Sequence, residues 1–236
     1  MPKINNGSEK KKNKRYSGKL AAKQISEGMN YANANARRLL SDAELLFQNK
    51  RYPSALGLAI LAIEESGKDR ILRSIAVNNK DEDLAKSWKE YRSHLAKNIL
   101  WIIPELVKSG ARVIDDFRQM VDKESEHPYL LDSIKQISFY TDCFGSNIWS
   151  NPDDVIREDI AKTIIQTAKI LIKDREITKT EIELWIKHIG PVWRKDFKMM
   201  KNALIEWAAD MKAHGLLEEK KENGFKEFVN QKEWIH

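Results

Sequence analysis

Acids, bases and cations stand at helical spacing in two short stretches of the sequence: Glu64, Glu65, Lys68, Arg92, His94 and Lys97. Metal-independent cleavage of RNA needs a general acid or base, a cation that stabilises the phosphate and a group that orients them. In this interpretation His94 is the acid or base, and Lys97 or Arg92 stabilises the phosphate. Glu65 is the candidate for the orienting carboxylate.

The same residues also have a structural interpretation. Charges on an apolar helix face are costly unless they are paired and hydrogen-bonded. Glu64 and Lys68 share a helix face with isoleucines, and Asp69 shares another with leucines. These groups could therefore form a buried network that holds two helices or a dimer interface together, and both interpretations stay open at this point.

A helical hairpin is the element that would position the two stretches. Residues 55–63 are apolar or Gly, and Pro53 suits a first helical turn, so a helix is expected from Tyr52 to about Asn78. A third helix should start near Asp81 and continue until Pro104 kinks or ends it. At about 1.5 Å per residue, Glu65 and His94 lie at similar heights if the two helices are antiparallel.

A third stretch, residues 129–152, adds Tyr140 and Asp142 to the expected polar network. A short helix leads into Tyr140, a Gly/Ser/Asn-rich loop follows, and Pro152 opens the next helix. The aromatic residues Tyr140 and Trp149 could equally anchor the loop.

Helical periodicity accounts for most of the remaining chain, and no alternating strand pattern is convincing. The predicted fold is therefore all-α. The other helices are expected at residues 18–48, 153–174, 178–189 and 192–213, and the last twenty residues could dock through Phe225, Phe228 and Trp234.

Composition restricts the class of protein. The net charge of +6 owes much to the run KKKNKR near the N-terminus, so it argues only weakly for nucleic acid. A single cysteine, Cys143, excludes a disulfide within the chain and a CxxC metal site. Without an apolar stretch of membrane-spanning length or a signal-peptide pattern, we expect a soluble, cytoplasmic protein with no membrane partner.

Three segments resemble the AbiV family of bacterial abortive infection proteins, which is grouped with the HEPN-like helical domains. They are AIEESGK, then YRSHLAK, then a Tyr-x-Asp followed by a turn-rich loop, a Trp and a Pro. The resemblance spans about residues 20–175. It implies a HEPN-like bundle that forms a homodimer through the organising helices. It also implies that a phage protein triggers the bundle, which then blocks phage multiplication by acting on RNA (tRNA or rRNA) or on translation.

The expected organisation has three parts. Residues 1–16 form a disordered basic tail, residues 17–175 the AbiV/HEPN-like helical domain, and residues 176–236 a C-terminal helical extension packed on the same domain.

The sequence departs from the HEPN ribonucleases in one respect. Their motif has four to six residues between an Arg and the His that follows it, and none of the five histidines here is preceded by an Arg at that spacing. His94 also lacks a second His at i+4, and Glu64 and Glu65 point about 100° apart, so neither a metal site nor a cofactor is expected. Two hypotheses remain: an effector that acts on RNA, or a non-enzymatic binder that acts through a phage or host protein.

Overall fold

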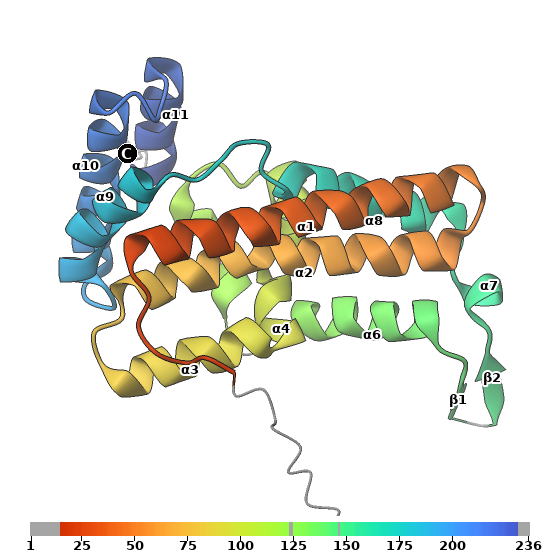
Figure 1. Cartoon of the computed structure of the whole chain (residues 1–236). Helices are drawn as coiled ribbons and strands as arrows, with labels where there is room; N and C mark the ends of the chain where they lie inside the picture. Colours follow the sequence, from red (N-terminus) through yellow and green to blue (C-terminus); the bar gives the residue numbers. More distant parts are fainter. Residues whose placement is uncertain (1–14, 123–124, 146, 231–236) are drawn as a thin grey trace, which may run out of the picture.

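The structure is a computed structural model that describes residues 15–122, 125–145 and 147–230. It confirms the all-α prediction, since helices dominate the described residues (Figure 1). The main helices are α1 (Ala22–Gln48), α2 (Tyr52–Val77), α3 (Asp81–Arg92), α6 (His127–Phe139), α8 (Glu158–Leu171), α9 (Lys179–Ile189), α10 (Phe197–Ala213) and α11 (Glu219–Val229). Shorter helical segments are α4 (His94–Lys97), η1 (Asn98–Ile102), α5 (Ile103–Lys108), η2 (Ile114–Val121), α7 (Pro152–Val155) and η3 (Gly190–Val192).

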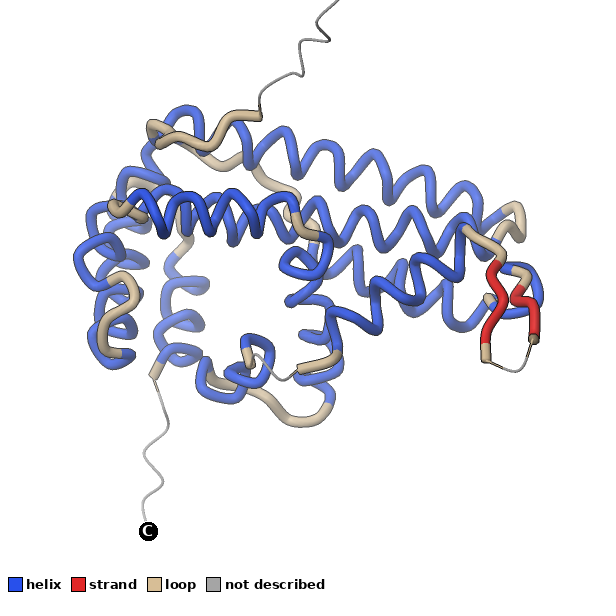
Figure 2. The backbone as a smooth tube through the Cα atoms, turned by 90° about the horizontal axis from the view of Figure 1, so that it is seen from below, coloured by secondary structure: helices blue, strands red, loops and turns tan. Residues whose placement is uncertain are grey.

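Helix α2 runs through the middle of the bundle. Figures 1 and 2 show α1 beside it along its length, with α6 and α8 along its other sides, and these are its main packing partners. Its apolar residues join those of α1, α6 and α8 in the first core cluster, which includes Leu56, Ile60, Ile63, Leu131 and Ile164. A helix that is apolar on every side is thus buried on nearly every side.

Two glycines let other elements approach α2 closely. A Cβ at Gly67 would lie 2.1 Å from the carbonyl oxygen of Lys97, and a Cβ at Gly57 would lie 2.3 Å from the ring of Phe139. No side chain fits at either position without moving its neighbour. Gly67, the glycine of the AIEESGK motif, is therefore the position at which the backbone of Lys97, the last residue of α4, contacts α2.

The C-terminal helices pack against the other end of α2. Ile177 and Ile182 share a second core cluster with Ile71 and Ile75 of α2. The guanidinium of Arg73 binds the fully buried carboxylate of Glu181.

Aromatic rings complete this contact between α2 and the C-terminal helices. The guanidinium carbon of Arg73 lies 5.0 Å from the ring of Trp185 and 5.6 Å from that of Trp207. Phe225 of α11 packs on Trp207 with 5.9 Å between ring centroids, as its predicted docking role requires.

Several predicted boundaries were wrong. The third helix breaks at Ser93, whose backbone is extended and whose hydroxyl caps α4, so α3 and α4 are separate. The helix predicted at residues 153–174 also breaks, at Ile156, whose backbone is extended. Helix α10 starts at Phe197, because Asp196 caps it by accepting from two backbone amides.

One small sheet was not anticipated from the sequence, and it leaves the all-α class unchanged. The described residues contain two short antiparallel strands, β1 (Asp142–Phe144) and β2 (Ile148–Ser150), at the loop after α6. Three residues per strand are too few for periodicity to reveal.

Both chain ends lie mostly outside the described residues. The basic run of the predicted N-terminal tail and Trp234 are among the residues that the structure does not describe. At the end of that predicted tail, Tyr16 packs edge-on to Trp88 with 6.0 Å between ring centroids.

The close approach at Gly67 predicts that Gly67→Ala destabilises the protein by about 2 kcal/mol or more, because overpacking outweighs the better helix propensity of Ala. Gly224→Ala in α11 is the matched control. Nothing lies within 4 Å of a Cβ at Gly224, so this variant should gain up to about 1 kcal/mol. Urea denaturation measures both, and an equal change in the two variants would contradict the close approach.

Asp210 makes the docking of α10 on α9 dependent on pH. Hydrogen bonds from Lys187 and His188 lower the pKa of Asp210 from 3.8 to about 2. A lowered carboxyl pKa contributes stability that is present above pH 3.8 and is lost as the pH falls towards 2. We expect acid titration to release α10, with a change in Trp fluorescence, and Asp210→Asn to abolish the part of this transition between those two pH values.

Candidate functional site

The carboxylate of Glu64 is the centre of a polar cluster inside the bundle. Glu64 is 2% exposed, and three cationic or ionisable side chains surround it. His94 Nδ1 lies 2.6 Å from Oε2, Lys135 Nζ donates to Oε1 at 2.6 Å, and Lys97 Nζ lies 3.6 Å from Oε2. The apolar run before Glu64 places this carboxylate in the core, and its neighbours supply the compensating charges.

Lys135 of α6 is the member of the cluster that sequence reasoning missed. It is 5% exposed and lies on the buried face of α6 between Leu131 and Ser138. Burial opposes its charge, but hydrogen bonds to Asp132 and Glu64 outweigh that effect and raise its pKa. A lone lysine on an apolar helix face was the available signal, and it is the same signal that identified Glu64.

The helix break at Ser93 presents His94 to Glu64. Ser93 ends α3 and caps α4, so His94 occupies the first position of the new helix. Its side chain is 58% exposed although Nδ1 contacts a buried carboxylate. With Nδ1–H donating to Glu64, the ring is held in one orientation and one tautomer, with Nε2 as the basic nitrogen.

Lys97 lies beside this pair and is nearly buried. Burial lowers its pKa, Glu64 raises it, and the nearby Lys68 lowers it further, so the net shift is downward. A lysine with a lowered pKa releases its proton more readily than an ordinary lysine. The backbone of Lys97 rests on Gly67, which fixes the height of the side chain relative to Glu64.

Glu65 and Lys68 form a neighbouring pair on α2. Lys68 Nζ donates to Glu65 Oε1 at 2.5 Å and lies 5.3 Å from the centroid of the Tyr91 ring. Both side chains are 17% exposed. In the structure, Glu64 rather than Glu65 contacts His94. Glu65 lies beside the cluster and pairs with Lys68.

The remaining predicted residues lie elsewhere. Arg92 points away from His94: its guanidinium donates to the carbonyl oxygens of Trp88 and Tyr16. Tyr140 and Asp142 lie at the hairpin beyond the end of α6 and line a cavity of about 320 Å³ there.

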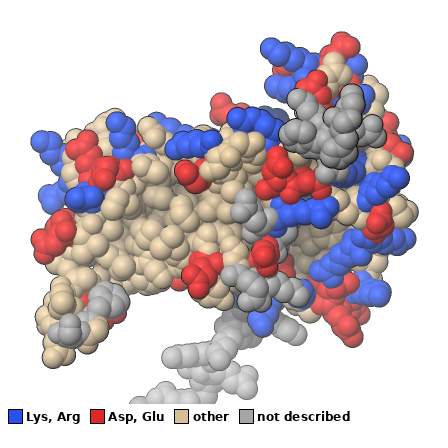
Figure 3. All heavy atoms as spheres, turned by 180° about the vertical axis from the view of Figure 1, so that it is seen from behind, with Lys and Arg blue, Asp and Glu red and all other residues tan. Residues whose placement is uncertain are grey.

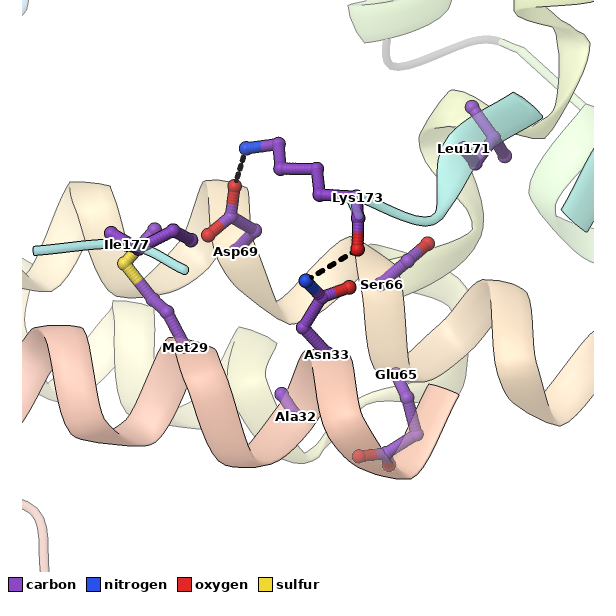
Figure 4. Close-up of a pocket in the computed structure, with 9 residues that line it drawn as sticks. All are labelled: Met29, Ala32, Asn33, Glu65, Ser66, Asp69, Leu171, Lys173 and Ile177. Atoms are coloured by element: carbon purple, nitrogen blue, oxygen red, sulfur yellow. Dashed lines mark hydrogen bonds and ion pairs between the residues drawn. The ribbon is translucent and has the colours of Figure 1, made fainter. Parts of the chain in front are cut away.

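Asp69 belongs to a separate contact between α2 and the segment after α8. Figure 4 shows the carboxylate of Asp69 and the ammonium of Lys173 pointing toward one another, and Asn33 donating to the carbonyl oxygen of Lys173 at 2.7 Å. The cavity that these residues line has a volume of about 20 Å³, room for about one water molecule. It is too small for a substrate.

The cluster therefore has one ionisable side chain, His94, that can exchange a proton with solvent or with a ligand. The side chains of Glu64, Lys97 and Lys135 are each less than one-tenth exposed, whereas His94 reaches solvent. Among the described residues, no group of three or more His, Cys, Asp or Glu could hold a metal ion. The arrangement is an oriented histidine backed by a buried carboxylate and two ammonium groups, which is suited to proton transfer.

The all-helical fold agrees with the class that the family comparison identifies, a HEPN-like helical protein. The family model described as AbiV matches residues 24–173, which is more than half of the chain, and the chain belongs to this family. Membership implies a defence role of the abortive infection type. No curated protein and no solved structure matches the chain. The search for membrane spans found no helix of sufficient length and apolarity in the described ranges.

The burial of Glu64 predicts a large effect of its charge on stability. Glu64→Gln leaves the nearly buried ammonium of Lys97 without its paired carboxylate and leaves Lys135 with Asp132 alone, and it should cost about 3–5 kcal/mol in urea denaturation. Glu65→Gln is the control, because its pair is more exposed, and it should cost about 1 kcal/mol. Combining Glu64→Gln with Lys135→Met should cost less than the sum of the single changes, and additive losses would contradict the contact.

Proposed function

We propose that this protein arrests phage multiplication by acting on RNA, tRNA or rRNA, or on translation, after a phage protein triggers it. The observation that carries this proposal is the exposed His94, whose Nδ1 lies 2.6 Å from the buried carboxylate of Glu64. Nε2 of the oriented ring would take the proton from a ribose 2′-hydroxyl or give one to the leaving oxygen. Lys97, with its lowered pKa, would supply positive charge near the phosphate.

A homodimer would complete this chemistry. Cleavage of RNA without a metal uses one group that removes a proton and another that donates one. Within the described part of the cluster, His94 is the solvent-reachable acid or base, because the other side chains are nearly buried. A second copy would bring a second His94. Light scattering of the purified protein tests the dimer.

Cell-free translation tests the function itself. Purified protein, with and without phage lysate, is added to a translation reaction, and total RNA is then run on a gel. Discrete cuts in tRNA or rRNA support the proposal. Inhibition with intact RNA contradicts cleavage.

The exposure of His94 predicts a clean separation of activity from stability. His94→Ala should abolish RNA cutting and growth arrest while the protein stays folded; the melting temperature should fall by only a few degrees, because Glu64 loses one hydrogen bond but keeps Lys135 and Lys97. His214→Ala, at an exposed histidine that ends α10, is the control and should keep full activity. Full toxicity of His94→Ala would exclude chemistry at this residue.

A second candidate function is binding of a phage or host protein without catalysis, and one surface favours it. Large apolar side chains are exposed at the end of α6 and on the hairpin that follows: Tyr140, Ile148 and Trp149. Tyr129 and Leu130 are also exposed, but at the opposite end of α6. Exposed apolar patches of this kind mark protein–protein contacts. This function requires that Trp149→Ser abolishes growth arrest while His94→Ala preserves it.

A further inference from the structure

A third cavity lies where the C-terminal helices meet the AbiV-like domain. Its volume is about 730 Å³, and residues from η2, α10 and the end of α11 line it. These residues are Asp115, Arg118, Phe197, Lys198, Lys201, Asn202 and Asn230. Contacts between η2 and both C-terminal helices hold it: Lys201 binds Asp115, and Phe117 packs on Phe228 with 5.7 Å between ring centroids.

The charge of the cavity is unbalanced. Among the described residues, its lining contains three cations, Arg118, Lys198 and Lys201, and one carboxylate, Asp115, so the cations outnumber the carboxylate by two. Asp115 binds Arg118 through Oδ1 at 2.8 Å and Lys201 through Oδ2. Its role is to position both cations rather than to neutralise the site.

The cations are also held in place by an aromatic ring. The guanidinium carbon of Arg118 lies 4.5 Å from the centroid of the Phe197 ring, and Lys201 Nζ lies 5.1 Å from it. The side chain of Arg118 remains 64% exposed, so its guanidinium is still available to an anion. A guanidinium with a fixed position loses less entropy when it binds a phosphate through two hydrogen bonds.

Figure 3 shows Lys and Arg side chains interspersed with Asp and Glu over the end of the molecule that carries the C-terminal helices, whereas the middle of the same face is largely uncharged. Asp196 precedes α10, and its carboxylate accepts hydrogen bonds from the backbone amides of Lys198 and Met199. An anion site here therefore depends on the lining residues themselves and not on a wider basic surface.

We propose that this cavity binds a nucleotide, with its phosphate on Arg118, Lys198 and Lys201. The volume falls within the range of sites for small organic ligands, about 300–1,000 Å³. The side-chain amides of Asn202 and Asn230 supply donors and acceptors for a base edge, and the Arg118–Phe197 stack supplies a flat surface on which a base can lie. The nucleotide is either free or part of a single RNA strand, and the choice of RNA rests on the proposed function.

Fluorescence anisotropy with two labelled probes, a short single-stranded RNA and ATP, tests the site. The double variant Arg118→Glu/Lys198→Glu should weaken binding at least about tenfold. For the RNA probe, loss of two phosphate contacts should also reduce the slope of log K against log salt by about 1.4. Both side chains are exposed, so circular dichroism melting should show an intact fold.

Lys86→Glu/Lys89→Glu on α3 is the matched control, because it changes the net charge equally at two exposed lysines away from the cavity. It should change affinity less than about twofold. Binding of ATP with the same dependence on Arg118 and Lys198 would identify a free nucleotide, and binding of RNA alone would identify a strand.

Equal losses in the two double variants, an unchanged salt slope, or no binding of either probe by the wild type would overturn the proposal. Binding is measured without cleavage or growth arrest, so its failure leaves the chemistry proposed for His94 untouched. Intact RNA in the translation experiment would contradict cleavage but would not contradict the proposed nucleotide site.

Discussion

The buried carboxylate of Glu64 is the constraint on which the arrangement of this bundle depends. An isolated carboxylate in a protein interior costs several kcal/mol, so the chain must bring cations to it. Lys135 reaches it from α6, and Lys97 and His94 reach it from α4. The helix break at Ser93 and the glycine at position 67 follow from this requirement, because together they let α4 and the start of η1 rest directly on α2.

Helix α2 carries a second charged group nearer its C-terminal end, and this group has a structural role. Arg73 binds Glu181, which Arg175 also contacts, and the rings of Trp185 and Trp207 cover the guanidinium. Burial opposes the charge of Glu181, but its two arginine partners lower its pKa. This group joins the family-matched domain to the C-terminal helices, and its acid stays charged, so it is a structural link.

Much of the fold could be predicted from the sequence, because apolar periodicity is strong in α1, α8 and α9 and a continuous apolar run marks α2. The break at Ser93 could not, since Ser93 is compatible with a helix and only the contacts of His94 and Lys97 with α2 favour the extended backbone. For the site, the charge-on-apolar-face argument identified Glu64, and the expected hairpin placed His94 on the neighbouring helix. The first argument would have identified Lys135 as well if it had been applied to α6. The position of Arg92 outside the cluster could not be predicted, because it depends on hydrogen bonds to the carbonyl oxygens of Trp88 and Tyr16.

Burial of charge also bears on the choice between the two interpretations of the Glu64 cluster, the catalytic and the structural one. Replacing a buried ion pair with well-packed apolar residues is often neutral or stabilising, so stability alone does not explain a carboxylate with two ammonium groups in a core. The Arg73–Glu181 group has a structural role that accounts for its burial, because it joins α2 to the C-terminal helices. The Glu64 cluster already lies among elements joined by an extensive apolar core, and it has an ionisable ring at the surface. A buried network that ends in one exposed histidine holds that histidine in a defined orientation, which is what proton transfer to a substrate requires.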